Sequence, residues 1–67
     1  MDDNKNLRIL RLPEVLARTG LSRSTIYELI TKGLFPHPIG LGTRSVGWIE
    51  AEINEWLAAR VAMSRIK

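Results

Sequence analysis

The 67-residue chain contains no cysteine and a single histidine, His37. A disulfide and a cysteine-ligated zinc site are therefore excluded, and one histidine is too few for a conventional metal site. The chain also has no apolar run long enough to cross a bilayer. It begins MDDNKN, which does not resemble a signal peptide. We therefore expect a cytoplasmic protein that is stabilised by packed apolar side chains.

The sequence also lacks the groups of residues on which catalysis usually depends. It has no matched set of serine, histidine and aspartate, no glycine-rich loop that would cradle a phosphate, and no cluster of metal ligands. We therefore expect that the protein is not an enzyme, and that it has no catalytic residue, no cofactor and no metal site.

The apolar residues that are present suffice for one small domain. They make up 45% of the chain, which is ordinary for a globular protein. A chain of this length buries only about 60% of the surface that its unfolded form exposes, so it builds a single core. We expect one domain over residues 1–67, with a polar and flexible segment at residues 1–6.

Positive charge is concentrated in the middle of the chain. Ten lysines and arginines against seven acids give a net charge of +3. Between residues 16 and 47, four cations accompany one acid, Glu28, so this segment alone accounts for +3. The segment that follows begins with Glu50, Glu52 and Glu55. This distribution favours a polyanionic partner for the central segment.

Proline, glycine and serine divide the first half of the chain into two short helices. Pro13 suits the first turn of a helix that begins with it or one residue earlier, and Gly20 suits the left-handed residue that ends it. Ser22 is a good N-cap for a second helix, which runs from residue 23 to about residue 32 and ends at Gly33. Two helices joined by so short a turn form a helix-turn-helix.

Alternating apolar residues predict a β-hairpin after a loop that contains two prolines. Ile39 and Leu41 precede a turn at residues 42–45, and Val46 and Trp48 follow it. The alternation places all four apolar side chains on one face. We refer to this turn, with Arg44 at its tip, as the wing.

A last helix is expected from Glu50 to about Met63, because apolar residues recur there at helical spacing. The fold class is therefore mainly α with a small β-hairpin, a winged helix-turn-helix. Trp48 and Trp56 could be platforms on which single-stranded nucleic acid stacks, but their apolar spacing favours the core. The expected core consists of Val15, Leu16, Leu21, Ile26, Leu29, Ile30, Phe35, Val46, Trp48, Ile53, Trp56 and Leu57.

The second predicted helix presents a polar face opposite its apolar stripe. Small hydroxyl side chains and flanking cations face outward when Ile26, Leu29 and Ile30 face inward. Small polar side chains let a helix approach a duplex and hydrogen-bond to phosphates or base edges, and a helix N-terminus favours a phosphate. The expected DNA-binding residues are Ser22, Arg23, Ser24, Thr25, Tyr27, Glu28 and Lys32 on this helix and Thr43, Arg44 and Ser45 in the wing.

Several polar residues allow two interpretations. Tyr27 either rests its ring on the core edge or directs its hydroxyl to a phosphate. Lys32 is either a solvated cation at the helix C-terminus or a phosphate contact. Lys5, Arg8 and Arg11 could form a basic N-terminal arm, but two neighbouring aspartates favour a solvated role.

The chain from Arg11 to Arg60 resembles the AlpA-type prophage regulators, which are small winged-helix proteins related in fold to phage excisionases and to the DNA-binding domains of MerR regulators. The resemblance is carried by GLSRSTIY, GLFPHPI, LGTRSVGW and the run from Glu52 to Trp56, and it covers about three quarters of the chain. It implies a DNA-binding transcription regulator that uses the second helix for recognition. Arg23, Ser24, Thr25 and Tyr27 match the family's DNA-contacting positions, and Arg44 matches its wing arginine.

Glu28 departs from the family's pattern, because a basic or neutral residue is expected there. Its carboxylate would repel phosphate; it either accepts from a cytosine N4 amine or points to solvent. A module this small buries only about 600–1,000 Å² on DNA. We therefore expect self-association on adjacent sites of double-stranded DNA, or a protein partner such as an integrase, and no membrane. The alternatives are an excisionase-like factor that bends DNA for recombination and a protein-interaction module that inhibits a partner.

Overall fold

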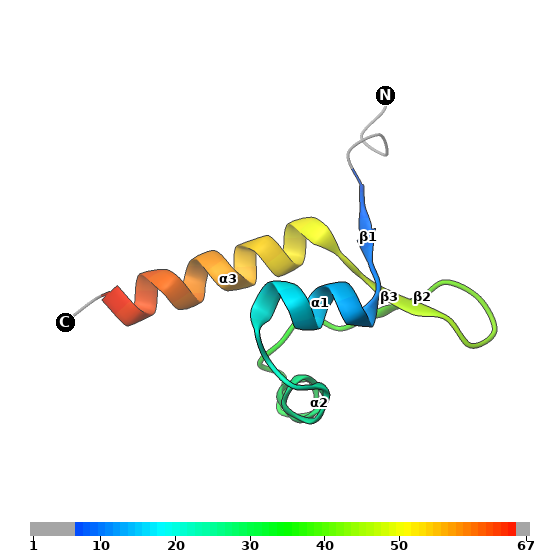
Figure 1. The fold of residues 1–67 in the computed structure, drawn as a ribbon, viewed down its shortest axis with the longest axis horizontal. Coiled ribbons are helices and arrows are strands. Elements are labelled where there is room, and N and C mark those ends of the chain that lie inside the picture. The colour runs from blue at the N-terminus through cyan, green and yellow to red at the C-terminus, as the bar shows by residue number, and fades with distance from the viewer. Residues whose placement is uncertain (1–6, 66–67) are drawn as a thin grey trace.

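The computed structural model describes residues 7–65, and its helices pack around a three-stranded sheet (Figure 1). The strands are antiparallel and lie in the order β1-β3-β2. This architecture confirms the predicted winged helix-turn-helix. The segment expected to be flexible, residues 1–6, lies outside the described part. The elements are β1 (Ile9–Leu10), α1 (Leu12–Thr19), α2 (Arg23–Thr31), β2 (Ile39–Gly40), β3 (Val46–Ile49) and α3 (Glu50–Arg65).

The turn between α1 and α2 is built by local hydrogen bonds. Gly20 adopts the left-handed conformation with φ of 74°, and its N–H donates to the Leu16 carbonyl at 2.8 Å. The Ser22 hydroxyl then accepts the backbone N–H of Thr25 at 3.2 Å. Both residues act as the sequence predicts, because a glycine tolerates positive φ and a serine satisfies a free N–H at a helix start.

The C-terminus of α2 is also capped by backbone hydrogen bonds. Gly33 has φ of 73°, and its N–H donates to the Ile30 carbonyl at 3.0 Å. The Leu34 N–H reaches back to the Leu29 carbonyl at 2.8 Å. This pair of bonds is a Schellman motif, which satisfies carbonyls that the helix end would leave unpaired. The helix ends at Thr31, one residue earlier than predicted.

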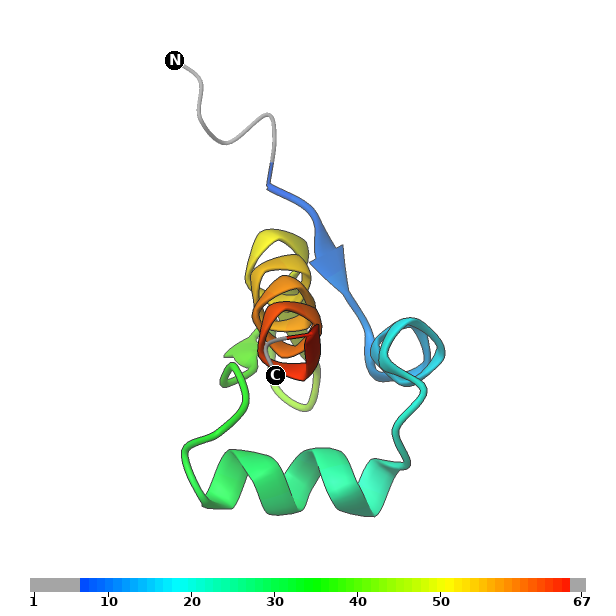
Figure 2. The ribbon, with the colours of Figure 1, turned by 90° about the vertical axis from the view of Figure 1, so that its left-hand side faces the viewer.

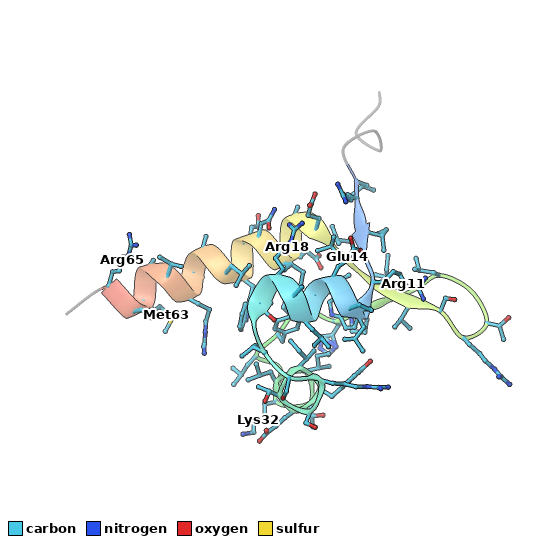
Figure 3. The ribbon with its side chains drawn as sticks, viewed as in Figure 1. Arg11, Glu14, Arg18, Lys32, Met63 and Arg65 are labelled. Carbon is cyan, nitrogen blue, oxygen red and sulfur yellow. The ribbon has the colours of Figure 1, made fainter. Side chains whose placement is uncertain are left out.

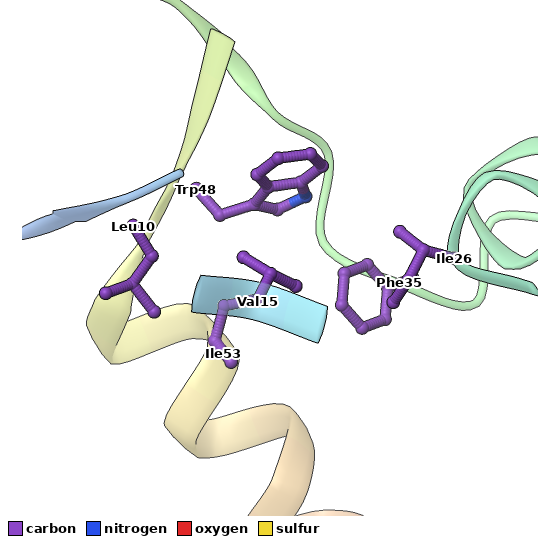
Figure 4. Close-up of a cluster of buried hydrophobic side chains, with 6 residues drawn as sticks. All are labelled: Leu10, Val15, Ile26, Phe35, Trp48 and Ile53. Atoms are coloured by element: carbon purple, nitrogen blue, oxygen red, sulfur yellow. The ribbon is translucent and has the colours of Figure 1, made fainter. Parts of the chain in front are cut away.

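The core takes one fully or almost fully buried side chain from nearly every part of the chain (Figure 4). Leu10 is missing from the predicted core, although it is fully buried and pairs with Trp48 of β3. Val46 was expected there but is 39% exposed, because it lies in the hairpin where it extends beyond the helices (Figure 1). The buried residues are Leu10, Val15, Ile26, Phe35, Trp48 and Ile53.

Both tryptophans pack in or against the core and hold the loop that follows α2. The Trp48 indole N–H donates to the Pro36 carbonyl at 3.0 Å, and that of Trp56 donates to the Leu34 carbonyl at 2.8 Å. The Phe35 ring packs edge-on against Trp56, with 4.7 Å between the ring centroids. The core assignment of both residues is therefore confirmed, and the loop connecting α2 to the sheet is held at two carbonyls.

The hairpin register differs from the prediction. Ile39 pairs with Gly47 and Gly40 with Val46, and the Leu41 N–H donates to the Ser45 carbonyl at 2.7 Å. Three residues therefore form the turn, and this odd number places Ile39 on the face opposite Val46. The prediction that the apolar residues share one face is wrong, because a shift of one residue moves a strand's side chains to the other side of the sheet.

Gly47 is buried, and it lies on the same face of the sheet as Ile39, with which it pairs. A Cβ atom there would overlap the Ile9 side chain and lie 3.1 Å from both the Leu10 carbonyl oxygen and a Leu41 methyl group. Only a residue without a side chain lets β1 and the hairpin approach this closely. Glycine at this position therefore allows the hairpin to pack closely against the N-terminal strand β1.

The two halves of α3 have different surroundings. Its first half packs against the core through Ile53 and two half-buried residues, Trp56 and Leu57. Every residue from Ala58 to Arg65 is exposed, and Figure 1 shows this half extending away from the domain. The helix continues two residues past the predicted end. No helix within residues 7–65 combines the length and the apolar character needed to cross a membrane.

Candidate nucleic-acid interface

One face of α2 is directed to solvent along an edge of the domain. In Figure 2 the helix runs along the bottom, with α3 above it and the core between them. Ile26 points into this core and is fully buried. Seven residues were expected to contact DNA from this helix and its caps. Ser22, Arg23, Ser24, Tyr27, Glu28 and Lys32 are exposed, and Thr25 is half-buried.

The hydroxyl groups on this face are not equally available. Ser22 accepts the Thr25 N–H and donates its own proton to the Thr25 hydroxyl oxygen at 2.9 Å. Thr31 donates its hydroxyl to the Tyr27 carbonyl at 3.0 Å. The hydroxyl protons of Ser24 and Thr25 have no acceptor within residues 7–65. Ser22 is therefore occupied as a cap, whereas Ser24 and Thr25 can donate to a ligand.

Ion pairs reduce the positive charge that the sequence places in this region. Lys32 lies 3.2 Å from the Glu28 carboxylate, one helical turn away. Arg18 points to α3, where it lies 3.0 Å from the Glu50 carboxylate and 3.2 Å from the Asn54 side chain oxygen. Two of the four central cations are therefore already paired. Arg23 and Arg44 form no ion pair to another residue of the described chain, so they are the charges available to an anionic partner.

The wing is short and carries its polar residues at the turn. Thr43 and Arg44 are exposed, and Ser45, whose carbonyl accepts the Leu41 N–H, is half-buried. The three wing residues that were expected to contact DNA therefore lie within one turn. The hairpin that carries them extends from the side of the molecule (Figure 1).

Arg11 connects the wing to the helix-turn-helix, and the sequence did not predict this role. Its side chain Nε–H donates to the Val46 carbonyl at 3.0 Å, while its backbone N–H donates to the Glu14 carboxylate at 3.1 Å. The residue lies at the start of α1 where this helix meets the hairpin (Figure 3). Since 35 positions separate Arg11 from Val46, no local sequence pattern could have predicted the contact.

The arrangement provides hydrogen-bond donors and positive charge. Within residues 7–65, no three histidine or acidic side chains lie close enough together to hold a metal ion. A helix with small polar side chains can enter a major groove, and an arginine on an adjacent hairpin can reach a phosphate or a minor groove. The surface formed by the polar face of α2 and by the wing therefore has the features of a duplex-binding interface.

Comparison with known proteins gives the family. A sequence model described as prophage CP4-57 regulatory protein (AlpA) matches residues 8–61. The chain belongs to the AlpA family. A DNA-binding transcriptional activator AlpA of Escherichia coli is 47% identical over 66 residues, which cover 90% of this chain and 94% of that protein. An uncharacterized protein, ORF88 of Enterobacteria phage P4, is 54% identical over 55 residues.

The extent of these matches differs between the two relatives. The alignment with the phage P4 protein covers 82% of this chain but only 62% of the phage protein's length. The AlpA family match extends from β1 to the middle of the exposed half of α3, so it includes α2 and the whole wing. The resemblance seen in the sequence motifs is therefore confirmed, and it includes the surface described above.

Proposed function

We propose that this AlpA family member is a sequence-specific, double-stranded-DNA-binding regulator of transcription that acts in the cytoplasm. In this proposal α2 enters the major groove and the wing at residues 42–45 contacts the flanking backbone. The proposal rests on the exposed face of α2 and on the wing, where Arg23 and Arg44 have no ion-pair partner in the described chain. The name of the Escherichia coli relative, a DNA-binding transcriptional activator, supports the same function.

The residues of this surface have different roles in the proposal. Arg23 and Ser24, in the first turn of α2, contact base edges or phosphates near the helix N-terminus, where free N–H groups also favour an anion. The hydroxyl groups of Thr25 and Tyr27 donate hydrogen bonds to the duplex. Ser22 contributes through the helix cap. In the wing, Arg44 is the main cation, and its neighbours Thr43 and Ser45 add hydrogen bonds.

The Glu28–Lys32 pair explains how an acid is tolerated on this face. In the free protein Lys32 compensates the charge of the carboxylate. In the complex, Lys32 turns to a phosphate and Glu28 accepts a hydrogen bond from a cytosine N4 amine, as carboxylates do in the major groove. The two interpretations of Lys32 thus correspond to the free and the bound state of the protein.

Binding measurements on two arginine variants test the proposal. Duplexes selected from a random pool supply the operator, and an unrelated duplex supplies the non-specific reference. We expect Arg23→Ala to weaken operator binding by about 1–3 kcal/mol and to relax selectivity at one position. Arg44→Ala is expected to weaken binding to both duplexes alike and to make the salt dependence shallower. The matched control is Arg65→Ala, which removes the same charge at the far end of α3.

Two results would favour the alternative functions. No binding to any duplex at low salt, where electrostatic attraction is strongest, would contradict DNA binding and favour a protein-interaction module. A strong bend in the bound DNA, together with integrase-dependent excision by the purified protein, would favour an excisionase-like factor over a promoter regulator. Unchanged operator affinity in both arginine variants would contradict the proposed surface.

A further inference from the structure

An open groove separates the loop after α2 from the first half of α3. Its volume is about 670 Å³. Leu34 is 56% exposed at its edge, and Trp56 lies at the wall that α3 contributes. Two carboxylates, those of Glu52 and Glu55, lie on the same wall. The groove is therefore apolar and acidic, whereas the proposed DNA surface presents unpaired cations, so the groove does not suit a nucleic acid.

The second half of α3, residues 58–65, which we call the tail, has the opposite charge. Met63 is 67% exposed, the highest value among the large apolar side chains of residues 7–65. Arg60 lies over the ring of Trp56 in the same helix, with 5.0 Å from its guanidinium carbon to the ring centroid. Arg60, Met63 and Ser64 line a small hollow of about 220 Å³. The tail thus offers an apolar side chain beside a cation, and it is the chemical complement of the groove.

The groove and the tail lie along one side of the same helix. Glu52 precedes Trp56 by four residues and Met63 follows Trp56 by seven, and both spacings keep side chains on one face of a helix. Ala59 lies between them, so a second helix can approach closely. If two copies of α3 pair in antiparallel orientation along this face, each tail lies over the groove of the other copy.

We propose that the groove binds the tail of a second copy of this chain, with Met63 against Leu34 and Arg60 near Glu55. This inference rests on the proposed DNA-binding function, because two copies bound to adjacent sites are where so small a contact has its effect. The contact is reciprocal, as a two-fold axis requires. It involves few residues, so the copies associate when DNA brings them together and only weakly in free solution.

The position of α2 makes this pairing compatible with one duplex. α2 lies beneath α3, while the groove lies beside α3 on the side of the 33–39 segment (Figure 2). A two-fold axis that runs from the α3 side to the α2 side therefore leaves both copies of α2 facing the same way. A two-fold dimer reads two half-sites in inverted orientation. Selected operators with two bound copies are expected to contain inverted repeats.

A cooperativity measurement separates this inference from the proposed function. Affinity is measured for a duplex with one half-site and for a duplex with two. We expect the wild-type protein to fill the second half-site more tightly than the first by a factor on the order of 5–150. Met63→Gln and Leu34→Gln are expected to lower this factor toward 1 and to leave the affinity for one half-site unchanged, because neither residue belongs to the DNA surface.

Val61 provides a matched control for Met63. It is also an exposed apolar residue of the tail, but two residues correspond to about 200° around the helix, so it faces away from the groove side. Val61→Gln is expected to retain full cooperativity. Glu55→Lys and Arg60→Glu should each reduce cooperativity, and the double variant should recover part of it, because the exchanged charges again attract each other.

Several results would overturn the inference. Cooperativity that persists in Met63→Gln and Leu34→Gln, an equal loss in Val61→Gln, or half-sites that occur as direct repeats would each contradict the paired tails. Sedimentation of the concentrated protein without DNA gives a second measurement, in which Met63→Gln must weaken self-association more than Val61→Gln does. Failure of the wild-type protein to bind even one half-site would instead contradict the proposed function, and the sedimentation result would then decide the inference alone.

Discussion

The two parts of the proposed DNA surface are held in place by different means. α2 is capped at both ends, buries Ile26 completely, and is followed by a loop that both indole N–H groups bind. The wing has a strand of only two residues, one hydrogen bond across its turn, and an exposed Val46. Its attachment to the rest of the structure depends on the hydrogen bond from Arg11 and on the absence of a side chain at Gly47, which lets Ile9 pack closely. A recognition helix is thus preformed, whereas the wing is positioned by a few contacts to its neighbours.

The largest difference between the two parts is expected for their apolar residues. Ile26→Ala should lower the free energy of unfolding by about 2–5 kcal/mol, because it leaves a cavity in the core. Val46→Ala in the wing should change it by less than about 0.5 kcal/mol, because this side chain is already exposed. Denaturant titration followed by circular dichroism measures both values. Similar losses in the two variants would contradict the contrast.

The second-largest loss of stability is expected at Gly47, where β1 packs closely against the hairpin. Gly47→Ala introduces a Cβ that overlaps Ile9, and we expect a loss of about 1–3 kcal/mol as the sheet shifts to accommodate it. Gly42→Ala is the control, since nothing lies within 4 Å of a Cβ at that position of the turn. Its unfolding free energy should remain within about 0.5 kcal/mol of the wild type. A tolerated Gly47→Ala would show that the wing can move away without cost.

A smaller loss is expected at the start of α2. Ser22→Ala removes the cap of the Thr25 N–H and should cost about 1 kcal/mol of stability. Ser24→Ala, two positions later, removes a hydroxyl that accepts no backbone N–H and should leave the thermal midpoint almost unchanged. DNA binding should show the opposite order, with Ser24→Ala losing direct contacts. Equal melting of the two variants would contradict the capping role of Ser22.

A still smaller loss of stability than that of Ser22→Ala is expected for the link between α1 and the wing. Arg11→Gln removes the bond to the Val46 carbonyl and should cost only about 0.5 kcal/mol, because the bond is exposed. Its local effect is larger: the amide of Leu41 should exchange with solvent faster while the amides of α2 do not change. Arg8→Gln is the control, since Arg8 approaches Glu14 only at 4.0 Å and has no bond to the wing. Unchanged exchange at Leu41 would contradict a positioning role for Arg11.

The sequence predicted the helix-turn-helix well because local chemistry defines it. Gly20 and Gly33 take the left-handed conformations expected at helix ends, and Ser22 caps α2. Each of these signals lies within a few residues of the group that it satisfies. The inward stripe of α2 follows from helical spacing alone, so the exposure of its opposite face was predictable as well.

The hairpin and the charges depend on contacts that are remote in the sequence. An alternation of apolar residues does not give the length of a turn, so the face of Ile39 was predicted wrongly. Leu10 was missing from the predicted core because a strand of two residues has too little periodicity to show which side is buried. Net charge likewise did not show that Arg18 pairs with Glu50 on another helix.

The amino-acid sequence by itself determined where the two helices of the helix-turn-helix begin, where they end to within one residue, and which face of α2 is polar, because capping and periodicity act over a few residues. Only the tertiary structure decided which cations remain unpaired, how the wing is attached, and which half of α3 packs against the core. These properties depend on atoms that come within a few ångströms of each other although dozens of residues separate them, as Arg11 and Val46 do. A linear pattern contains no measure of that distance.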